Sequence, residues 1–395
     1  MNNTAYEQAG VDVESGDSFS SFAGEICRST WNNSPFVKIT DLSSGLFRGP
    51  RGFEFQGLPR GTITSATTDG VGTKSIITSA SGDFYQAGYD VVAMCAGDIT
   101  RYGGIPLVFL NCFDTRKLGK PNETIHSKQR EILQGLSMIS ERQKFVVLQG
   151  ETAELRDCVT SEIPLGEGVA YNWAGMMIGA YDPEKMIKGE DIEVGDVIIG
   201  LQEYGFRSNG ISLVRTILRQ KYGDEWWQNQ HAMPAITNAA KPSSLYDHAL
   251  CELNRWYGNL PETKGIKKVK AIAHISGGGI PSKLGEDILF PRGLSATLDS
   301  LVEPPGVMKV FASWWAEGRT PYTSHREIYD SWHGGPGVLM IVRKEDVDPC
   351  INFFESRHIT AERCGEIVSG QKPSLEIHSR FYGNEVFEVT PKDKE

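Results

Sequence analysis

The sequence lacks the features that mark several classes of protein. No apolar run reaches the roughly 18 residues that a helix needs to span a bilayer. The first residues, Met-Asn-Asn-Thr-Ala-Tyr-Glu, contain neither the basic nor the apolar region of a signal peptide. A basic surplus is also missing, because the net charge is −10, and this argues against a nucleic-acid binder. The charge does not exclude an anionic substrate, since local lysines and glycine amides can bind phosphate.

The spacing of the cysteines argues against a disulfide framework and against a zinc site. The chain has seven, an odd number, and none belongs to a C-x-x-C pair. Scattered cysteines of this kind favour reduced thiols in a cytosolic protein. Cys95 lies in an apolar segment, which favours a packing role over that of a nucleophile. The seven are Cys27, Cys95, Cys112, Cys158, Cys251, Cys350 and Cys364.

Length and periodicity predict a two-domain protein of the α/β class, with an α+β second domain. A chain of 395 residues is too long for one typical core. The turn Tyr181-Asp-Pro-Glu184 sets the predicted boundary, which gives domains over 1–180 and 181–395. Besides a strand in the β-prone run 61–66, we predict three further strands, two helices and a mobile loop in the first domain. These three strands cover 105–111, 145–148 and 173–178, the helices cover 16–28 and 124–138, and the loop covers 43–61.

The stretch over residues 67–74 carries the strongest chemical signal. It follows a short β-prone run, so a strand would deliver its acid to the C-terminal end. Two glycines then let the backbone approach a ligand, and a hydroxyl and a cation follow. This set suits a metal-bound polyphosphate, although it does not fit the Walker pattern. A hairpin turn with an incidental acid and lysine is the alternative. The residues concerned are Asp69, Gly70, Gly72, Thr73 and Lys74.

Five further segments of similar chemical character follow in a fixed order. Each places acids, a histidine or glycines next to a strand-like run or the start of a helix. The segments are Asp90-Val-Val-Ala-Met-Cys-Ala-Gly-Asp98, Gly150-Glu-Thr-Ala-Glu154, Arg207-Ser-Asn-Gly-Ile-Ser-Leu-Val214, Ala273-His-Ile-Ser-Gly-Gly-Gly279 and Ser331-Trp-His-Gly-Gly-Pro-Gly337. In this combination, over nearly the whole chain, the sequence resembles the aminoimidazole ribonucleotide synthetase family, also called phosphoribosylformylglycinamidine cyclo-ligase.

The resemblance implies a β-rich first domain that binds ATP and dimerises, followed by an α+β domain. It implies an ATP-dependent enzyme of de novo purine biosynthesis that phosphorylates the amide oxygen of formylglycinamidine ribonucleotide. A nitrogen of the same molecule then closes the imidazole ring and expels phosphate. This chemistry needs Mg²⁺ and precise positioning, but no protein nucleophile. The expected partners are a phosphoribosyl substrate and a second copy of the chain, without nucleic acid or membrane, in the cytoplasm.

Acids, glycines and a few polar side chains make up the predicted site. Asp98 could instead be an N-cap or turn aspartate, Glu151 could be a substrate contact, and Lys74 could be solvated. His274 could be a core histidine, but the three glycines that follow favour a function. The predicted catalytic residues are Asp69, Lys74 and His274, and the predicted Mg²⁺ ligands are Asp69, Asp98 and Glu151. Those predicted to bind the nucleotide or substrate are Gly70, Gly72, Thr73, Asp98, Asn209, Gly277 and Gly278.

The sequence departs from the family's pattern at positions beside these residues. Gly97 stands in place of an asparagine, Gln149 in place of a glycine and Arg207 in place of a histidine. His333 begins the stretch that replaces the family's Asn-Cys-Gly-Val-Gly. The metal-binding acids are retained while substrate-side residues differ, so a paralogue that activates another amide or small substrate with ATP is the alternative. A nucleotide-binding regulator is less consistent, because a pure binder has less need of several metal-binding acids.

Overall fold

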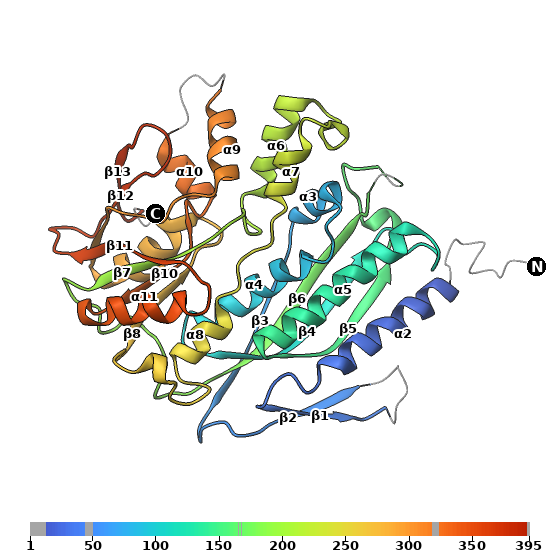
Figure 1. Cartoon of the computed structure of the whole chain (residues 1–395), viewed down its shortest axis with the longest axis horizontal. Helices are drawn as coiled ribbons and strands as arrows, with labels where there is room; N and C mark the ends of the chain where they lie inside the picture. The colour runs from blue at the N-terminus through green and yellow to red at the C-terminus, as the bar shows by residue number, and fades with distance from the viewer. Residues whose placement is uncertain (1–12, 44–49, 165, 167, 318–323, 393–395) are drawn as a thin grey trace, which may run out of the picture. The chain divides into compact units, whose positions relative to one another are not determined.

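The computed structural model describes residues 13–43, 50–164, 166, 168–317 and 324–392 (Figure 1). The chain divides into two compact units. The first contains residues 1–96 and 106–182, and the second contains residues 97–105 and 183–395. The sequence prediction placed one boundary after residue 180 and did not separate segment 97–105 from the first domain.

The first unit is built on a four-stranded sheet with the order β3-β6-β4-β5. β3 and β6 are antiparallel, whereas β4 and β5 are parallel. Side chains along a strand point alternately to the two faces, so buried Trp173 and Met177 alternate with exposed Met176. One face of the sheet is therefore packed and the other is open. The strands are β3 (Ile63–Gly70), β4 (Ile105–Thr115), β5 (Val146–Glu154) and β6 (Tyr171–Tyr181).

Helices cover the packed face of this sheet and its β5 edge. α5 (Thr124–Gln143) buries Ile132, Leu136 and Ile139, which recur at helical spacing. α2 (Val13–Thr30) lies along α5 and β5 (Figure 1). The hydroxyl of Thr30 accepts a hydrogen bond from the Val147 N–H at 2.9 Å, which satisfies a donor at the sheet edge. The remaining helices of this unit are α3 (Lys74–Ser81) and α4 (Ala87–Thr100), the second of which continues into the other unit.

The predicted strands and helices of the first domain are confirmed, although their bounds differ. The predicted loop over 43–61 is wrong for β2 (Arg51–Phe55), which pairs antiparallel with β1 (Val37–Asp41). Its glycines and prolines predicted a loop from local preference alone, whereas a strand also depends on its partner. Residues 44–49 of that stretch lie outside the described residues.

The second unit contains a seven-stranded sheet with the order β13-β12-β9-β11-β7-β10-β8. Its strand pairs are antiparallel, except that β12 and β9 are parallel. Side chains of the sheet, including Ile199 and Met340, form a core with Leu250 and Phe353 of two covering helices. The strands are β7 (Val197–Gln202), β8 (Val269–His274), β9 (Ser295–Leu298), β10 (Pro336–Val342), β11 (Ala361–Val368), β12 (Leu375–His378) and β13 (Val386–Val389). The α-helices are α6 (Ile211–Tyr222), α7 (Met233–Ala239), α8 (Asp247–Leu253), α9 (Gly306–Ala316), α10 (His325–Ser331) and α11 (Val347–Glu355), and a π-helix covers Pro281–Leu289.

Segment 97–105 is held in the second unit by side-chain hydrogen bonds. Asn254 Nδ2 and Trp256 Nε1 donate to the Gly103 carbonyl at 2.6 and 2.8 Å. The segment therefore carries the end of α4 to the strands and helices of this unit. Among the described helices, none combines the length and the apolar character that a membrane crossing requires.

Candidate functional site

The 67–74 motif forms the end of β3, a tight turn and the start of α3. Asp69 pairs with Gly175 of β6, and its Oδ1 accepts a hydrogen bond from the Gly70 N–H at 2.7 Å. Gly72 has a φ of 54°, in the left-handed region that glycine adopts without strain. Thr73 then immediately precedes α3. The strand, acid and glycine turn lie where the sequence predicted them, and Asp69 is partly exposed.

Lys74 is fully buried, which the sequence did not indicate. Its Nζ lies 2.7 Å from Asp90 Oδ1 in α4, and the aspartate is also buried. The alternative interpretation of Lys74 as a solvated side chain is therefore wrong. A buried pair of this kind is costly to break, because the partner left behind would be an uncompensated charge. The pair ties the first residue of α3 to α4 and so supports the turn that carries Asp69. A contact between Lys74 and phosphate stays a prediction.

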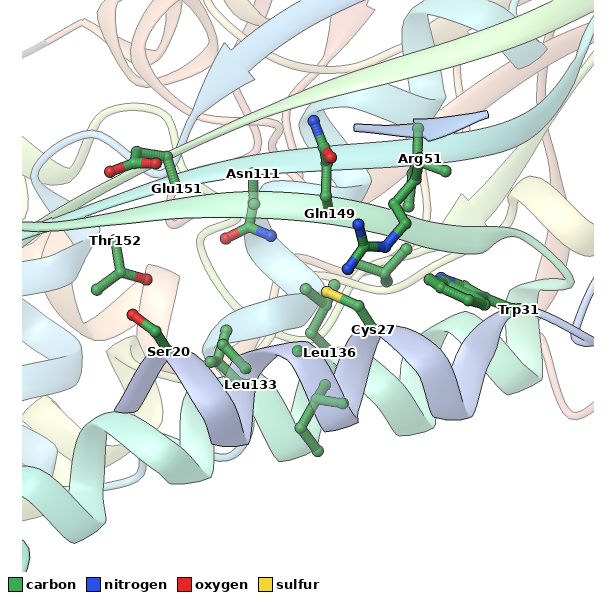
Figure 2. A pocket seen from close by; sticks show the side chains of 16 residues that line it. Ser20, Cys27, Trp31, Arg51, Asn111, Leu133, Leu136, Gln149, Glu151 and Thr152 are labelled. Carbon is green, nitrogen blue, oxygen red and sulfur yellow. The ribbon is translucent and has the colours of Figure 1, made fainter. Parts of the chain in front are cut away.

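Glu151 lies at the rim of a cavity of about 450 Å³ between α2 and the end of β5 (Figure 2). Gln149 and Glu151 point to one side of β5, whereas Asn111 and Thr152 point to the side of α2. The Arg51 guanidinium, which the sequence analysis placed in a loop, also lines this cavity and pairs with Asp41 at 3.4 Å.

Cys27 also lines this cavity, and it does not behave as a nucleophile. Burial raises the pKa of its thiol to about 11, so the thiol stays protonated at neutral pH. The cavity therefore offers hydrogen-bonding groups and one carboxylate at its rim, without an activated nucleophile.

Asp69 and Glu151 do not form one preformed metal site. They belong to β3 and β5, and β6 and β4 lie between these two strands. At ordinary strand spacing, β3 and β5 are therefore about 14 Å apart. Asp69 and Glu151 also point to opposite faces. Asp69 is in register with Gly175, where a Cβ would meet Val91 of α4, whereas Glu151 is in register with exposed Cys112. Within the described ranges, no three Asp, Glu, His or Cys side chains are grouped as a metal would require.

Asp98, the third predicted metal ligand, is exposed in the last turn of α4. The alternative of an N-cap or turn aspartate is therefore wrong, because Asp98 lies within the helix. Asp98 belongs to the second unit, whereas Asp69 and Glu151 belong to the first.

In the second unit the predicted glycine loop follows β8, which ends at His274. Gly278 and Gly279 have φ values of 81° and 61°. The Asn209 amide nitrogen lies beside Gly277, 3.5 Å from the position of a Cβ there. Ser208 Oγ and Asn209 Oδ1 are buried without hydrogen-bond partners. Since buried polar atoms are nearly always paired, these two atoms are candidates to contact a ligand.

The departure at Gly97 is explained by the packing of His274. A Cβ at residue 97 would lie 2.8 Å from His274 Nδ1, closer than a real contact allows. The family's asparagine therefore does not fit beside His274 in this arrangement. Burial lowers the pKa of His274 well below its ordinary value, so the ring is neutral.

We expect Gly97→Ala to lower the free energy of unfolding by about 1–3 kcal/mol, because the added methyl group must displace the His274 ring. Gly16→Ala in α2 is the matched control, since nothing lies within 4 Å of a Cβ there. Alanine in that helix should stabilise the protein by about 0.5–1 kcal/mol. Urea unfolding of the two variants measures both values. Equal stability of Gly97→Ala and the wild type would contradict the close packing.

The departures at Arg207 and His333 belong to one buried cluster. Arg207 Nη1 lies 3.0 Å from Glu203 Oε2, and both side chains are buried. His333 Nε2 donates to the Gly205 carbonyl at 2.7 Å, and its Nδ1 accepts from the Gly335 N–H. Burial lowers the pKa of His333 to about 4, so this ring is also neutral. Arg207 is thus engaged inside the second unit.

Sequence reasoning missed Glu203, Thr100 and Asp247, which contact the predicted residues. Thr100 Oγ1 lies 3.0 Å from His274 Nε2 and 2.6 Å from Asp247 Oδ1. These contacts join residues 147 and 174 positions apart. No local motif could indicate them.

Comparison with known proteins agrees with this architecture. Residues 57–179 match the family "AIR synthase related protein, N-terminal domain", and residues 193–378 match its C-terminal domain. A phosphoribosylformylglycinamidine cyclo-ligase of Crocosphaera subtropica is 30% identical over 93% of this chain and 98% of its own length. One from Rippkaea orientalis is 29% identical over 93% of this chain and 97% of its own length.

Solved structures show the same fold at low sequence identity. Thiamine-monophosphate kinase from Stenotrophomonas maltophilia is 13% identical, with a TM-score of 0.56, over 89% of this chain and 94% of its own. The hydrogenase maturation protein HypE in complex with ATP is 13% identical, with a TM-score of 0.55, over 93% of this chain and 92% of its own. With both domains matched and relatives similar over nearly its full length, the chain belongs to the AIR synthase family, among the phosphoribosylformylglycinamidine cyclo-ligases.

Proposed function

We propose that this protein closes the imidazole ring of aminoimidazole ribonucleotide from formylglycinamidine ribonucleotide, with ATP, in de novo purine biosynthesis. The observation that carries the proposal is the similarity to enzymes of that name over 93% of the chain. The strand, acid and glycine turn at 67–74 supports it with a local geometry suited to a polyphosphate. The protein is accordingly an ATP-dependent ligase, and we place it in the cytoplasm.

The residues of the site in the first unit would bind ATP, and those in the second unit would bind the substrate. In the first unit, the backbone of Gly70 and Gly72 and the Thr73 hydroxyl would bind the phosphates of ATP. In the second unit, Asn209 and the loop of Gly277 and Gly278 would bind the ribose phosphate through amide donors. The ATP then phosphorylates the amide oxygen, and the attacking nitrogen belongs to the substrate itself. No protein nucleophile is needed, in agreement with the protonated thiol of Cys27.

The separation of the acids fits Mg²⁺ that arrives with the nucleotide. Mg²⁺ is usually held by one or two carboxylates together with substrate phosphates, and it would screen their charge. Asp69, Asp98 and Glu151 supply oxygen ligands of the hard kind that Mg²⁺ prefers. Asp69 and Glu151 would therefore serve different ions, or ions bound to different copies of the chain. Lys74 would support this site through Asp90, and a direct phosphate contact would require its ammonium to leave that carboxylate.

A homodimer is part of the proposal and gives a second testable prediction. The open face of the first unit's sheet exposes Ala66, Thr68 and Met176, and Glu151 lies on the same face. We expect a dimer at micromolar concentration by light scattering, and a shift towards monomer in Met176→Glu, because a charge would be buried in the contact. Val194→Glu is the control, since Val194 is an exposed residue of the second unit. A monomeric wild type would contradict the dimer.

The paralogue remains the second candidate because of one specific position. Gln149 replaces a glycine of the family and points from β5 at the rim of the first-unit cavity (Figure 2). A side chain there changes the space available to a ligand. Arg207 and His333 lend the paralogue less support, since both are engaged in the buried cluster with Glu203. Arg207→His is therefore expected to reduce stability rather than to redirect specificity.

The deciding experiment mixes the protein with ATP, Mg²⁺ and formylglycinamidine ribonucleotide. We expect ADP and aminoimidazole ribonucleotide to form in equal amounts. Calorimetry with ATP and Mg²⁺ is measured in parallel, and ATP should bind in the micromolar to millimolar range. ATP binding without turnover of this substrate would reject the purine reaction and favour the paralogue, and Gln149→Gly would then be tested for recovery of turnover.

A further inference from the structure

Three buried side chains from separate segments of the second unit form a chain of hydrogen bonds. Thr100 is the last residue of α4, Asp247 the first of α8 and His274 the last of β8. Thr100 Oγ1 lies 2.6 Å from Asp247 Oδ1 and 3.0 Å from His274 Nε2. All three side chains are at least nine-tenths buried. The hydroxyl therefore connects a carboxylate to an imidazole away from water.

The chemistry of these groups fixes the direction of both hydrogen bonds. An ionised carboxylate can only accept, and a threonine hydroxyl has one proton to donate. Thr100 must therefore donate to Asp247, and its oxygen must accept from His274 Nε2–H. Burial raises the pKa of Asp247 to about 6, which leaves the carboxylate mainly ionised at neutral pH. The neutral ring of His274 then carries its proton on Nε2, and its Nδ1 has a free lone pair.

That Nδ1 atom is buried and has no hydrogen-bond partner. A histidine held only for structural reasons would be expected to satisfy both ring nitrogens, because an unpaired buried acceptor is costly. Among the other unpartnered buried side-chain atoms of the same unit, Ser208 Oγ and Asn209 Oδ1 belong to the segment beside Gly277. The glycine loop that contains Gly277 begins three residues after His274. Unsatisfied polar atoms thus occur on both segments predicted to bind substrate.

We propose that Asp247 and Thr100 are positioning residues that hold His274 in the Nε2-protonated tautomer, so that Nδ1 accepts a hydrogen bond from an N–H group of the bound substrate. The hydrogen-bonded chain Asp247–Thr100–His274, called the relay below, follows from the geometry. The identity of the substrate as an amidine-containing nucleotide rests on the proposed function. Thr100 contacts His274 directly, and Asp247 acts on the ring through the Thr100 hydroxyl. Their effect on the reaction is therefore exerted through the tautomer and the orientation of the ring.

Selective ¹⁵N labelling of histidine and NMR of the ring nitrogens test the relay in the substrate-free protein. The chain has eight histidines, and the signals lost in His274→Gln identify the residue. Protonated and unprotonated ring nitrogens have well-separated chemical shifts, so the spectrum reports the tautomer. We expect the wild type to carry its proton on Nε2. Thr100→Val, which keeps the shape and removes the hydroxyl, should lose this preference, whereas Thr100→Ser should retain it.

Activity supplies a second readout. With the substrate of the proposed function, kcat should fall on the order of a hundredfold in Thr100→Val, as for loss of a correctly protonated group. It should stay close to the wild-type value in Thr100→Ser, and the KM for ATP should be unchanged in both. Addition of substrate to the wild type should shift the Nδ1 signal of His274, and this shift should be absent in Thr100→Val.

The outcomes separate the relay from the proposed function. A wild-type proton on Nδ1, or the same tautomer in Thr100→Val and the wild type, would overturn the relay whatever the substrate. An Nε2-protonated wild type that does not turn over the purine substrate would support the relay and reject only the substrate. Circular dichroism confirms folding of each variant. If Thr100→Val does not fold, Asp247→Asn replaces it, because an amide both donates and accepts and so no longer fixes the proton on Nε2.

Discussion

Arg207→Met is expected to lower the free energy of unfolding by about 3–5 kcal/mol. The substitution removes the guanidinium 3.0 Å from the Glu203 carboxylate, which is fully buried. Glu203 keeps hydrogen bonds from the Tyr204 N–H and from Ser244, but these are neutral donors and do not compensate a buried charge. Chemical denaturation followed by tryptophan fluorescence measures the loss.

Two further variants show whether the unpaired buried charge causes the loss of stability in Arg207→Met. Arg363→Met removes an ion pair with Asp299 in which both side chains are about 40% exposed, and it should cost less than about 1 kcal/mol. The double variant Arg207→Met with Glu203→Gln removes both charges, and it should recover most of the lost stability. A loss below about 1 kcal/mol in Arg207→Met would contradict a charge pair shielded from solvent.

Asp69→Asn is expected to lower the turnover of Mg-ATP by on the order of a hundredfold or more. In the wild type, Asp69 Oδ1 accepts a hydrogen bond from the Gly70 N–H at 2.7 Å. The asparagine side chain still offers an oxygen to this N–H, so the turn should persist. What is lost is the negative charge at the end of β3. ADP formation at saturating substrate measures the effect, and the unfolding midpoint should match that of the wild type.

Asp157→Asn is the matched control for this loss of charge. Asp157 belongs to the same unit, and its side chain is 97% exposed beside Arg116. Its replacement should leave turnover unchanged. If Asp69→Asn folds normally and keeps near-normal turnover, Asp69 serves the fold, and the proposed metal site at β3 is wrong.

The sequence alone indicated those features that depend on neighbouring residues. The apolar spacing in 124–138 predicted α5, and the β-prone run before Asp69 predicted β3 with an acid at its end. The ordered set of six motifs predicted the family. Each of these signals is local, because side-chain periodicity and turn chemistry are written in consecutive residues.

The tertiary structure decided what depends on partners far along the chain. β2 formed where glycines and prolines predicted a loop, since its strand partner β1 supplies the hydrogen bonds. The sheet order placed Asp69 and Glu151 on strands that have two others between them, and on opposite faces, although their motifs had suggested a common metal site. Lys74 proved to be buried against Asp90, which composition could not reveal.

The same distinction holds for the substrate-side departures. In sequence, Arg207 and Gly97 are isolated replacements. In the fold, Arg207 neutralises Glu203, and the absent side chain of Gly97 makes room for His274. The relay through Thr100 likewise joins residues 147 and 174 positions apart. A sequence lists which groups are available, but burial and distance, which set their charge state and hydrogen bonds, exist only after the chain has folded.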